Sequence, residues 1–291
     1  AGYGWMITYL SKKRRGKSEQ GAAWRLINTC SRYDRTEEQI DITSHESFSY
    51  FDSIKLYHMA YAGRQLVGFV SLFIPTPGEA ELAGFVHPRY RKRGIFTQLT
   101  ERASSQLRQH DIPAVVYVAN RDSRAGTAVM RQHGCRLRET EYFMEQSPDR
   151  PVPATAVACR TAGAGDRELL IDINCTVFDE ERAIAEKMID NLFSSGATAY
   201  LLEYSGKIIG MGCSSTSRRS RAVFLFGFGL LPSFRGSGLG KGAFNALLLA
   251  IRRSTVKPVA LEVSSSNASA LRLYRESGFR TTATYDYYLP E

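Results

Sequence analysis

The segment from Arg235 to Gly240 reads Arg-Gly-Ser-Gly-Leu-Gly and stands between an apolar strand-like run and an apolar helical run. A glycine-rich turn at the start of a helix directs several free backbone N–H groups at one point, and the helix dipole adds positive potential there. A Cβ at these positions would hold a phosphate away from the N–H groups. The segment therefore predicts a phosphate or pyrophosphate site on the backbone of Arg235, Gly236, Ser237, Gly238, Leu239 and Gly240, with the Arg235 side chain adding charge.

Two other phosphate-binding loops do not fit these residues. A P-loop needs a glycine five positions before Gly240 and a hydroxyl residue after Lys241, but the chain has Arg235 and Gly242 there. A dinucleotide fingerprint needs a third glycine where Lys241 stands, and it follows the first strand of its unit. The spacing and the position of the loop exclude both.

A degraded copy of the segment lies 144 positions earlier, where Arg91 stands opposite Arg235 and Gly94 opposite Gly238. The same offset pairs further residues without a gap: Pro88 with Pro232, Tyr90 with Phe234, Ile95 with Leu239, Val115 with Val259, Gly134 with Gly278 and Arg136 with Arg280. A period this long indicates two copies of a whole domain. We expect domains at residues 1–147 and 154–291, joined by a stiff connector that contains Pro148, Pro151 and Pro153.

The spacing of apolar residues predicts the element order of the second copy as strand, two helices, three strands, helix, strand, helix and strand. The expected ranges are Val157–Arg160, Asp166–Phe178, Glu180–Phe193, Tyr200–Glu203, Lys207–Cys213, Val223–Leu231, Gly238–Arg253, Pro258–Val263, Ala268–Ser277 and Thr284–Leu289. The first copy repeats this order less clearly, from Met6–Leu10 to Glu141–Glu145. The order predicts an α/β (α+β) fold, a mixed sheet with helices on both faces.

A second motif follows in the second copy. Glu262 interrupts an apolar strand, where a carboxylate is costly unless it is partnered or functional. Asn267, Tyr274 and Gly278-Phe279 follow at fixed spacing. The two motifs together resemble the GNAT superfamily of acyl-CoA-dependent N-acyltransferases and cover about half of the second copy. The tandem layout is similar to that of the mycothiol synthases and other double-GNAT enzymes.

The resemblance implies acetyl-CoA or another acyl-CoA as the donor and no metal. It implies that the backbone of Phe228, Gly229 and Leu230 binds the pantetheine arm and that Tyr274 is the general acid. Glu262, or a water molecule, is the expected base that frees the amine for attack on the thioester. Asn267 caps the last helix or binds the cofactor arm. The alternative readings are a half-buried aromatic for Tyr274 and a strand glutamate that reaches solvent or an arginine for Glu262.

The first copy departs from the family pattern. It has Phe96 at the third glycine position, Met130 opposite Tyr274, Val118 opposite Glu262 and Ser123 opposite Asn267. We therefore expect a degenerate, mainly structural first domain and a catalytic second one. A catalytic first copy stays open, because GNAT enzymes without the tyrosine exist and because Glu79 and Glu81 lie near where other members place a base.

The acceptor is expected to be an amine-bearing small molecule or a peptide. In the family it contacts two regions, which correspond here to Phe178–Arg182 and Tyr285–Tyr288. Acidic residues in these segments could pair with an amine cation, although carboxylates at helix starts also stabilise the helix dipole. The residues do not separate a small amine, an antibiotic, an amino acid and a protein N-terminus.

Composition is that of an ordinary globular chain, with 43% hydrophobic and 23% charged residues and a net charge of +9. The five scattered cysteines form no CxxC pair, which favours a reducing cytoplasm over a disulfide framework or zinc site. We expect no membrane span, no signal peptide, no nucleic-acid partner, and a monomer that is a pseudo-dimer within the chain.

Two alternatives to an acetyltransferase remain open at this stage. One is a non-catalytic acyl-CoA-binding or regulatory protein on the same fold. The other is a nucleic-acid-binding protein driven by the positive charge. The densest basic run, Lys12–Lys17, is expected to be a solvated loop or a contact with an anionic partner.

Overall fold

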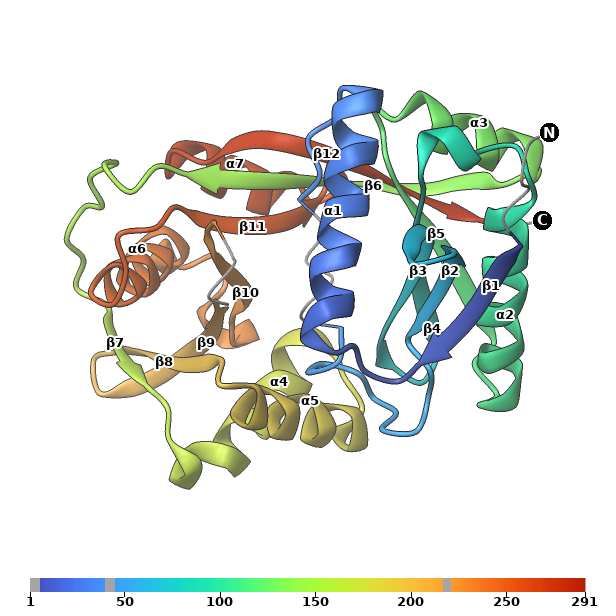
Figure 1. Cartoon of the computed structure of the whole chain (residues 1–291). Coiled ribbons are helices and arrows are strands. Elements are labelled where there is room, and N and C mark those ends of the chain that lie inside the picture. Colours follow the sequence, from blue (N-terminus) through green and yellow to red (C-terminus); the bar gives the residue numbers. More distant parts are fainter. Residues whose placement is uncertain (1–5, 40–44, 217–220, 291) are drawn as a thin grey trace. The chain divides into compact units, whose positions relative to one another are not determined.

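The computed structural model describes residues 6–39, 45–216 and 221–290 (Figure 1). The chain falls into two compact units. Unit 1 comprises Ala1–Glu141 together with Ala283–Glu291, and unit 2 comprises Tyr142–Thr282. Each unit has its own hydrophobic core.

Unit 1 is a sheet in the order β1-β2-β3-β4-β5-β12, with α1 and α2 on opposite sides of its strands (Figure 1). Strands β4 and β5 are parallel, and the other pairs in this part of the sheet are antiparallel. The elements are β1 (Ile7–Lys12), α1 (Lys17–Asp34), β2 (Tyr57–Ala62), β3 (Gln65–Thr76), β4 (Glu79–Val86), η1 (Pro88–Tyr90), α2 (Ile95–Gln109), β5 (Ala114–Asn120), α3 (Arg124–Gln132), the start of β6 (Arg136–Gln146) and most of β12 (Arg280–Leu289).

Unit 2 repeats this plan in the order β6-β11-β10-β9-β8-β7. Its elements are the end of β6, β7 (Ala158–Thr161), η2 (Ala164–Asp166), α4 (Arg167–Phe178), α5 (Arg182–Ser195), β8 (Thr198–Tyr204), β9 (Lys207–Ser215), β10 (Val223–Leu230), η3 (Pro232–Phe234), α6 (Leu239–Arg252), β11 (Val259–Ser264), α7 (Ala268–Glu276) and the start of β12. Each element predicted for the second copy is present, with ends shifted by a few residues. The mixed sheet is confirmed.

In both units the two central parallel strands part at their carboxyl ends. Strand β4 pairs with β5 from Glu79 to Leu82, and β10 pairs with β11 only at Val223 and Phe224. Beyond these pairs each strand runs on without its parallel neighbour. In β10 the register against β9 also shifts after Phe226, where Gly227 takes a positive φ of 60°. The parted ends leave a notch of the kind that binds ligands in α/β sheets.

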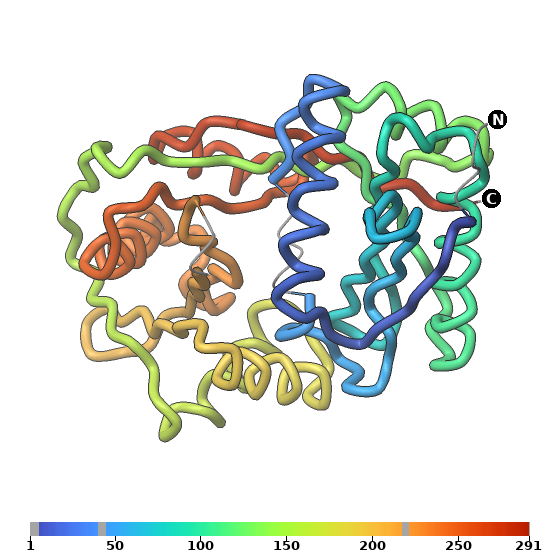
Figure 2. Tube along the Cα trace, viewed as in Figure 1, coloured from blue at the N-terminus to red at the C-terminus, as the bar shows by residue number. Residues whose placement is uncertain are grey.

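The last strand lies elsewhere than the sequence predicts. Residues from Ala283 onward belong to unit 1, where β12 pairs antiparallel with β5, Tyr285 opposite Asn120 and Tyr288 opposite Tyr117 (Figure 2). The predicted division at residues 147 and 154 therefore differs from the division of the structure. Because the domain is duplicated, the last strand of either copy could pair with β5 or with β11. The sequence does not show that β12 pairs with β5 and β6 with β11.

Candidate functional site

The glycine loop of unit 2 has the geometry that its sequence predicts. Gly236 and Gly238 take positive φ values of 72° and 83°, which side chains disfavour, and α6 begins directly afterwards. A Cβ built on Gly236, Gly238 or Gly240 meets no other atom within 4 Å. The first turn of a helix has N–H groups without intrahelical acceptors. The loop therefore presents backbone donors to open space.

The Arg235 side chain, expected to add charge at the phosphate site, is hydrogen-bonded to two backbone carbonyls. Its Nε donates to the carbonyl of Leu230 at 2.9 Å and its Nη2 to the carbonyl of Val177 at 2.9 Å. Its backbone N–H donates to Pro232 at 3.2 Å. The guanidinium therefore holds the loop to the ends of β10 and α4, and the backbone from Gly236 to Gly240 stays the predicted phosphate site.

The end of β10 is crowded by the end of α4. A Cβ on Gly229 would lie 2.3 Å from Cγ1 of Val177, so only glycine fits there. The Phe228 ring packs edge-on against Phe244, with centroids 5.1 Å apart. The predicted pantetheine-binding strand end thus lies beside the predicted phosphate loop.

Tyr274 lies on α7 in the aromatic cluster of unit 2. Its ring centroid is 5.1 Å from that of Phe244 and 6.0 Å from that of Phe279. Burial raises the pKa of the Tyr274 hydroxyl, so it stays protonated at neutral pH. The side chain is half-buried, and its hydroxyl has no hydrogen-bond partner among the described residues.

Glu262 is exposed on β11. Its neighbours Leu261 and Val263 belong to the core of unit 2, so alternation along the strand places Glu262 on the opposite face. Glu262 therefore reaches solvent, which is the alternative that the sequence left open, and its role as a base stays a prediction.

Asn267 caps α7. Its Oδ1 accepts a hydrogen bond from the N–H of Ala270 at 3.1 Å. Ser123, its counterpart in the first copy, caps α3 in the same way through the N–H of Gly126 at 3.1 Å. Capping thus explains both residues.

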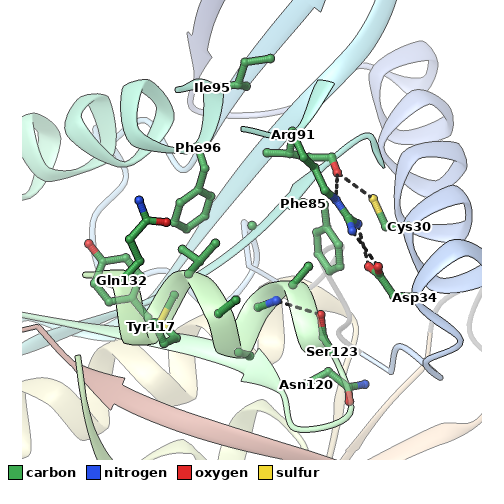
Figure 3. Close-up of a pocket in the computed structure, with 18 of the residues that line it drawn as sticks. Cys30, Asp34, Phe85, Arg91, Ile95, Phe96, Tyr117, Asn120, Ser123 and Gln132 are labelled. Carbon is green, nitrogen blue, oxygen red and sulfur yellow. Dashed lines mark hydrogen bonds and ion pairs between the residues drawn. The ribbon is translucent and has the colours of Figure 1, made fainter. Parts of the chain in front are cut away.

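A pocket of about 630 Å³ lies in unit 1, at the parted ends of β4 and β5. The start of α2, α3 and the end of α1 complete its walls, and Phe85, Phe96 and Tyr117 point into it (Figure 3). The copy that the sequence marks as degenerate therefore has a well-formed cavity.

The two copies have an aromatic ring and a glycine at swapped positions. In unit 1 the ring of Phe96, at the start of α2, covers Gly84 so closely that a Cβ there would lie 2.7 Å from it. The equivalent positions in unit 2 are Gly240 at the start of α6 and Phe228 on the strand. Phe96 thus packs over the strand, and a Cβ on Gly94 still meets no atom within 4 Å.

The other residues singled out in the first copy have structural partners. Arg91 donates to the Val86 carbonyl at 3.0 Å and to both carboxylate oxygens of Asp34 at 2.7 Å. Met130 is buried, and Glu79 is ion-paired with Arg138.

Glu38 is a pocket residue that the sequence did not single out. It follows α1 and accepts hydrogen bonds from the hydroxyls of Thr36 at 3.3 Å and Tyr285 at 3.2 Å. Burial raises the pKa of the Glu38 carboxyl to about 7, the charge of Asp34 adds to this, and the hydrogen bonds oppose it. No motif marks Glu38, because its partner Tyr285 lies 247 positions away.

The two expected acceptor segments are not in the same unit. Phe178–Arg182 lies in unit 2, where Arg182 pairs with Glu168, Asp172 and Glu186 on the surface. Tyr285–Tyr288 lies in unit 1, where Asp286 is buried against Arg121 and Thr140. That both segments contact the acceptor stays a prediction, and β12 brings the second segment into the sheet of unit 1.

The basic run at 12–17 is not a single solvated loop. Lys12 is ion-paired with Glu19, and Arg15 is buried with its guanidinium 4.1 Å from the Tyr57 ring centroid. Within the residues that the structure describes, no group of three or more His, Cys, Asp and Glu side chains could hold a metal ion. No described helix has the length and apolar character needed to cross a bilayer.

Several curated proteins are similar to this chain over most of its length. A mycothiol acetyltransferase from Saccharomonospora viridis is 26% identical over 247 residues, which cover 77% of this chain and 79% of the relative. One from Thermobispora bispora is 26% identical over 242 residues, covering 76% of this chain and 79% of the relative.

Solved structures share the fold. A GCN5-related N-acetyltransferase from Sphaerobacter thermophilus superposes with a TM-score of 0.77 at 20% identity, covering 97% of this chain and 94% of that one. A tandem GNAT protein from the clavulanic acid biosynthesis pathway has a TM-score of 0.72 at 16% identity and covers 97% of this chain and 98% of its own.

The model of the acetyltransferase (GNAT) family matches this chain twice, at residues 21–134 and 168–279. The matches fall on the two repeats and include the notch, the glycine loop and the following helix in each. The chain therefore belongs to the GNAT family of acetyltransferases and carries two copies of its fold.

Proposed function

We propose that the chain transfers an acetyl group from acetyl-CoA to a primary amine, and that the reaction takes place in unit 2. One observation carries this proposal: the open backbone donors of Gly236–Gly240 lie next to the parted strands β10 and β11, in the unit that also supplies Tyr274. A diphosphate fits the donors, and an extended arm fits the strand end at Phe228 and Gly229.

The chemistry is direct attack within a complex of both substrates. The ammonium group of the acceptor first loses a proton to Glu262 or to water, and the amine nitrogen then attacks the thioester carbonyl carbon. The carbon–sulfur bond breaks and the amide forms with loss of the second proton from nitrogen. Tyr274 donates its proton to the departing thiolate and regains one from solvent, so one proton is released in total.

The proposed acid and the proposed base lie on different sides of β11. Tyr274 packs with the aromatic cluster on the core face, where its protonated hydroxyl can act as an acid. Glu262 lies on the opposite, solvent-exposed face, where an ammonium group can reach it from water. The notch between the parted strands would join the two faces. The five scattered cysteines favour the reducing cytoplasm as the place of the reaction.

The acceptor is proposed as a class only, a primary amine. The curated relatives are named mycothiol acetyltransferases, so their acceptor belongs in the first panel of amines to be tested. Amino acids, peptide N-termini and small polyamines complete that panel.

The test is a steady-state assay of free thiol release by the full chain with acetyl-CoA and each amine. We expect Tyr274→Phe to lower kcat by about 10²-fold or more, the usual value of a general acid, with little change in KM for acetyl-CoA. Glu262→Gln should lower kcat and steepen its dependence on pH. The matched control is Met130→Leu in unit 1, which leaves turnover unchanged.

Two results would contradict the proposal. Full activity of Tyr274→Phe would show that Tyr274 is not the general acid. Binding of acetyl-CoA without turnover of any amine would favour the alternative of a non-catalytic, regulatory acyl-CoA-binding protein.

A further inference from the structure

Tyr274 stands in the last turn of α7, where the backbone forms a tight C-terminal cap. The N–H of Phe279 donates to the carbonyl of Tyr274 at 3.0 Å. The N–H of Gly278 donates to the carbonyl of Arg275 at 3.0 Å, and Gly278 takes the positive φ of 90° that a Schellman cap needs. The place of the Tyr274 backbone therefore depends on how residues 277–279 are held.

The side-chain amide of Gln146, the last residue of β6, holds this cap. Its Nε2 donates to the carbonyl of Ser277, the C-cap residue of α7, at 2.7 Å. Its Oε1 accepts from Nη2 of Arg252, at the end of α6, at 2.7 Å. An arginine only donates and a carbonyl only accepts, so these partners fix which end of the amide faces each of them. Gln146 is only 1% exposed and therefore joins the ends of α6 and α7 in one orientation.

Arg252 in turn fixes the chain around Gln146. Its Nη1 donates to the carbonyl of Lys257 at 2.9 Å, and its Nη2 donates to that of Ser147 at 2.8 Å. These partners are uncharged oxygens, so the guanidinium acts here as a fork of donors that orients the amide. We call Gln146 and Arg252 the α7 clamp.

The Tyr274 hydroxyl takes its direction from the ring and from the backbone. Phe244 of α6 packs against Tyr274 and against Phe279, with ring centroids 5.1 Å and 5.8 Å away. The hydroxyl itself has no hydrogen-bond partner among the described residues. An acid must lie within hydrogen-bond reach of the atom that it protonates. The packing of α6 and the α7 clamp are thus what can place this oxygen.

The first copy forms the same cap with other residues at the clamp positions. At the offset of 144, the residues opposite Tyr274, Gln146 and Arg252 are Met130, Pro290 and Arg108. Proline has no side-chain amide, and Arg108 is exposed. Even so, the N–H of Cys135 donates to the carbonyl of Met130 at 2.9 Å. The cap therefore forms without a glutamine, and the α7 clamp accompanies the tyrosine.

We propose that Gln146 is a positioning residue of the reaction: it holds the end of α7 so that the Tyr274 hydroxyl reaches the departing sulfur, and Arg252 orients Gln146. This inference rests on the proposed function, in which Tyr274 is the acid. A displacement of about 1 Å can cost a reaction up to about 10²-fold in rate. The predicted phosphate site at Gly236–Gly240 lies on another segment, so release of the cap should lower kcat and spare KM for acetyl-CoA.

Two substitutions of Gln146 share the loss of the bond to Ser277. Gln146→Glu keeps an acceptor for Arg252 and adds a charge to that pair, but it has no N–H for the Ser277 carbonyl. Gln146→Met keeps the length of the side chain and removes both hydrogen bonds. Gln146→Met should therefore lower the midpoint of urea denaturation more than Gln146→Glu does.

The assay is thiol release by the full chain with acetyl-CoA and the amine of the panel that it acetylates fastest. We expect both variants to lower kcat by about ten-fold and to change KM for acetyl-CoA by less than about two-fold. An equal loss in two variants of unequal stability would follow the bond to Ser277.

The matched control is Gln106→Glu in α2 of unit 1. Gln106 also uses both ends of its amide: Oε1 accepts from the N–H of Lys55 at 3.2 Å, and Nε2 donates to Oε1 of Gln109 at 2.9 Å. The same change of charge and donor, made away from α7, should leave kcat unchanged.

A double-variant cycle separates the positioning of Tyr274 from a general loss of structure. Added to Tyr274→Phe, Gln146→Glu should lower kcat by less than about two-fold, because the hydroxyl that it positions is already gone. Three results would overturn the inference: an unchanged kcat in Gln146→Glu, a fall confined to Gln146→Met, or a ten-fold fall that persists in the Tyr274→Phe background. Full activity of Tyr274→Phe, or no turnover of any amine, would instead contradict the proposed function and this inference with it.

Discussion

The hydroxyl of Tyr285, on the last strand of the chain, donates a hydrogen bond to the Glu38 carboxylate, 247 positions earlier. This contact lies wholly within unit 1, because β12 is a strand of the unit 1 sheet. The C-terminal residues of the chain therefore help to build the pocket of the N-terminal copy.

The raised pKa of Glu38 predicts a pH dependence of stability. The folded protein holds this proton up to about pH 7, whereas an unfolded chain releases it near the ordinary value of 4.5. The unfolding free energy contributed by Glu38 therefore falls as pH rises through that window, by at most about 3 kcal/mol. Glu38→Gln lacks this dependence. Urea denaturation should therefore show that the unfolding free energy of the variant rises relative to that of the wild type between about pH 5 and pH 8. Parallel profiles would show that Glu38 has an ordinary pKa.

The ion pair between buried Asp286 and partly exposed Arg121 gives a second prediction. Asp286 accepts from Arg121 at 2.6 Å and from Thr140 at 2.7 Å. Asp286→Asn should lower the unfolding free energy by about 1–2 kcal/mol, since the arginine is partly exposed. Hydrogen exchange should quicken at residues 117–120 of β5 and not at residues 259–263 of β11. Faster exchange in β11 instead would place the last strand in unit 2.

Cutting the chain between Pro148 and Pro153 separates β12 from β5, so the resulting halves are not faithful tests of either copy.

The swapped positions of ring and glycine in the two copies, Gly84 and Phe96 against Phe228 and Gly240, can be tested by mutation. Gly240→Phe puts a ring where unit 2 is open and should raise KM for acetyl-CoA about ten-fold or more, because the ring screens the backbone donors. It should also destabilise unit 2 by about 1–3 kcal/mol, because Phe228 carries a ring at the position where unit 1 has Gly84 beneath Phe96. The double variant Phe228→Gly, Gly240→Phe reproduces the pairing of Gly84 and Phe96, so it should regain stability without regaining affinity. Additive effects on stability would show that the two rings do not compete.

The helix caps give a matched pair. Asn267→Ala and Ser123→Ala each remove one cap and should each cost about 1 kcal/mol of unfolding free energy. Asn267→Ser installs the residue of the first copy and should restore stability, with KM for acetyl-CoA unchanged. A raised KM in Asn267→Ser would show that the asparagine amide also contacts the cofactor.

The sequence predicts local structure well where the signal is local. The turn at Gly236 and Gly238, the cap at Asn267 and the alternation around Glu262 all follow from neighbouring residues. Three features depend on contacts between distant residues and escape such reasoning: the strand that β12 joins, the use of Arg235 as a brace to Val177, and the contact of Tyr285 with Glu38. The degenerate look of the first copy also misleads in one respect, because Phe96 turns toward Gly84 and the pocket stays open.

The position of β12 also determines the order in which the protein can be completed during synthesis. Unit 2 is continuous in the chain, from Tyr142 to Thr282, and all of it is synthesised before Ala283, where the second segment of unit 1 begins. Unit 1 must wait with one edge of β5 unpaired until Asp286 arrives, 165 positions after Arg121, which takes roughly 10–30 s at ordinary rates of translation. An unpaired strand edge is open to aggregation in that interval. Unit 1 is thus begun before unit 2 and completed after it, and the open edge of β5 is a place where chaperones can bind in the interval.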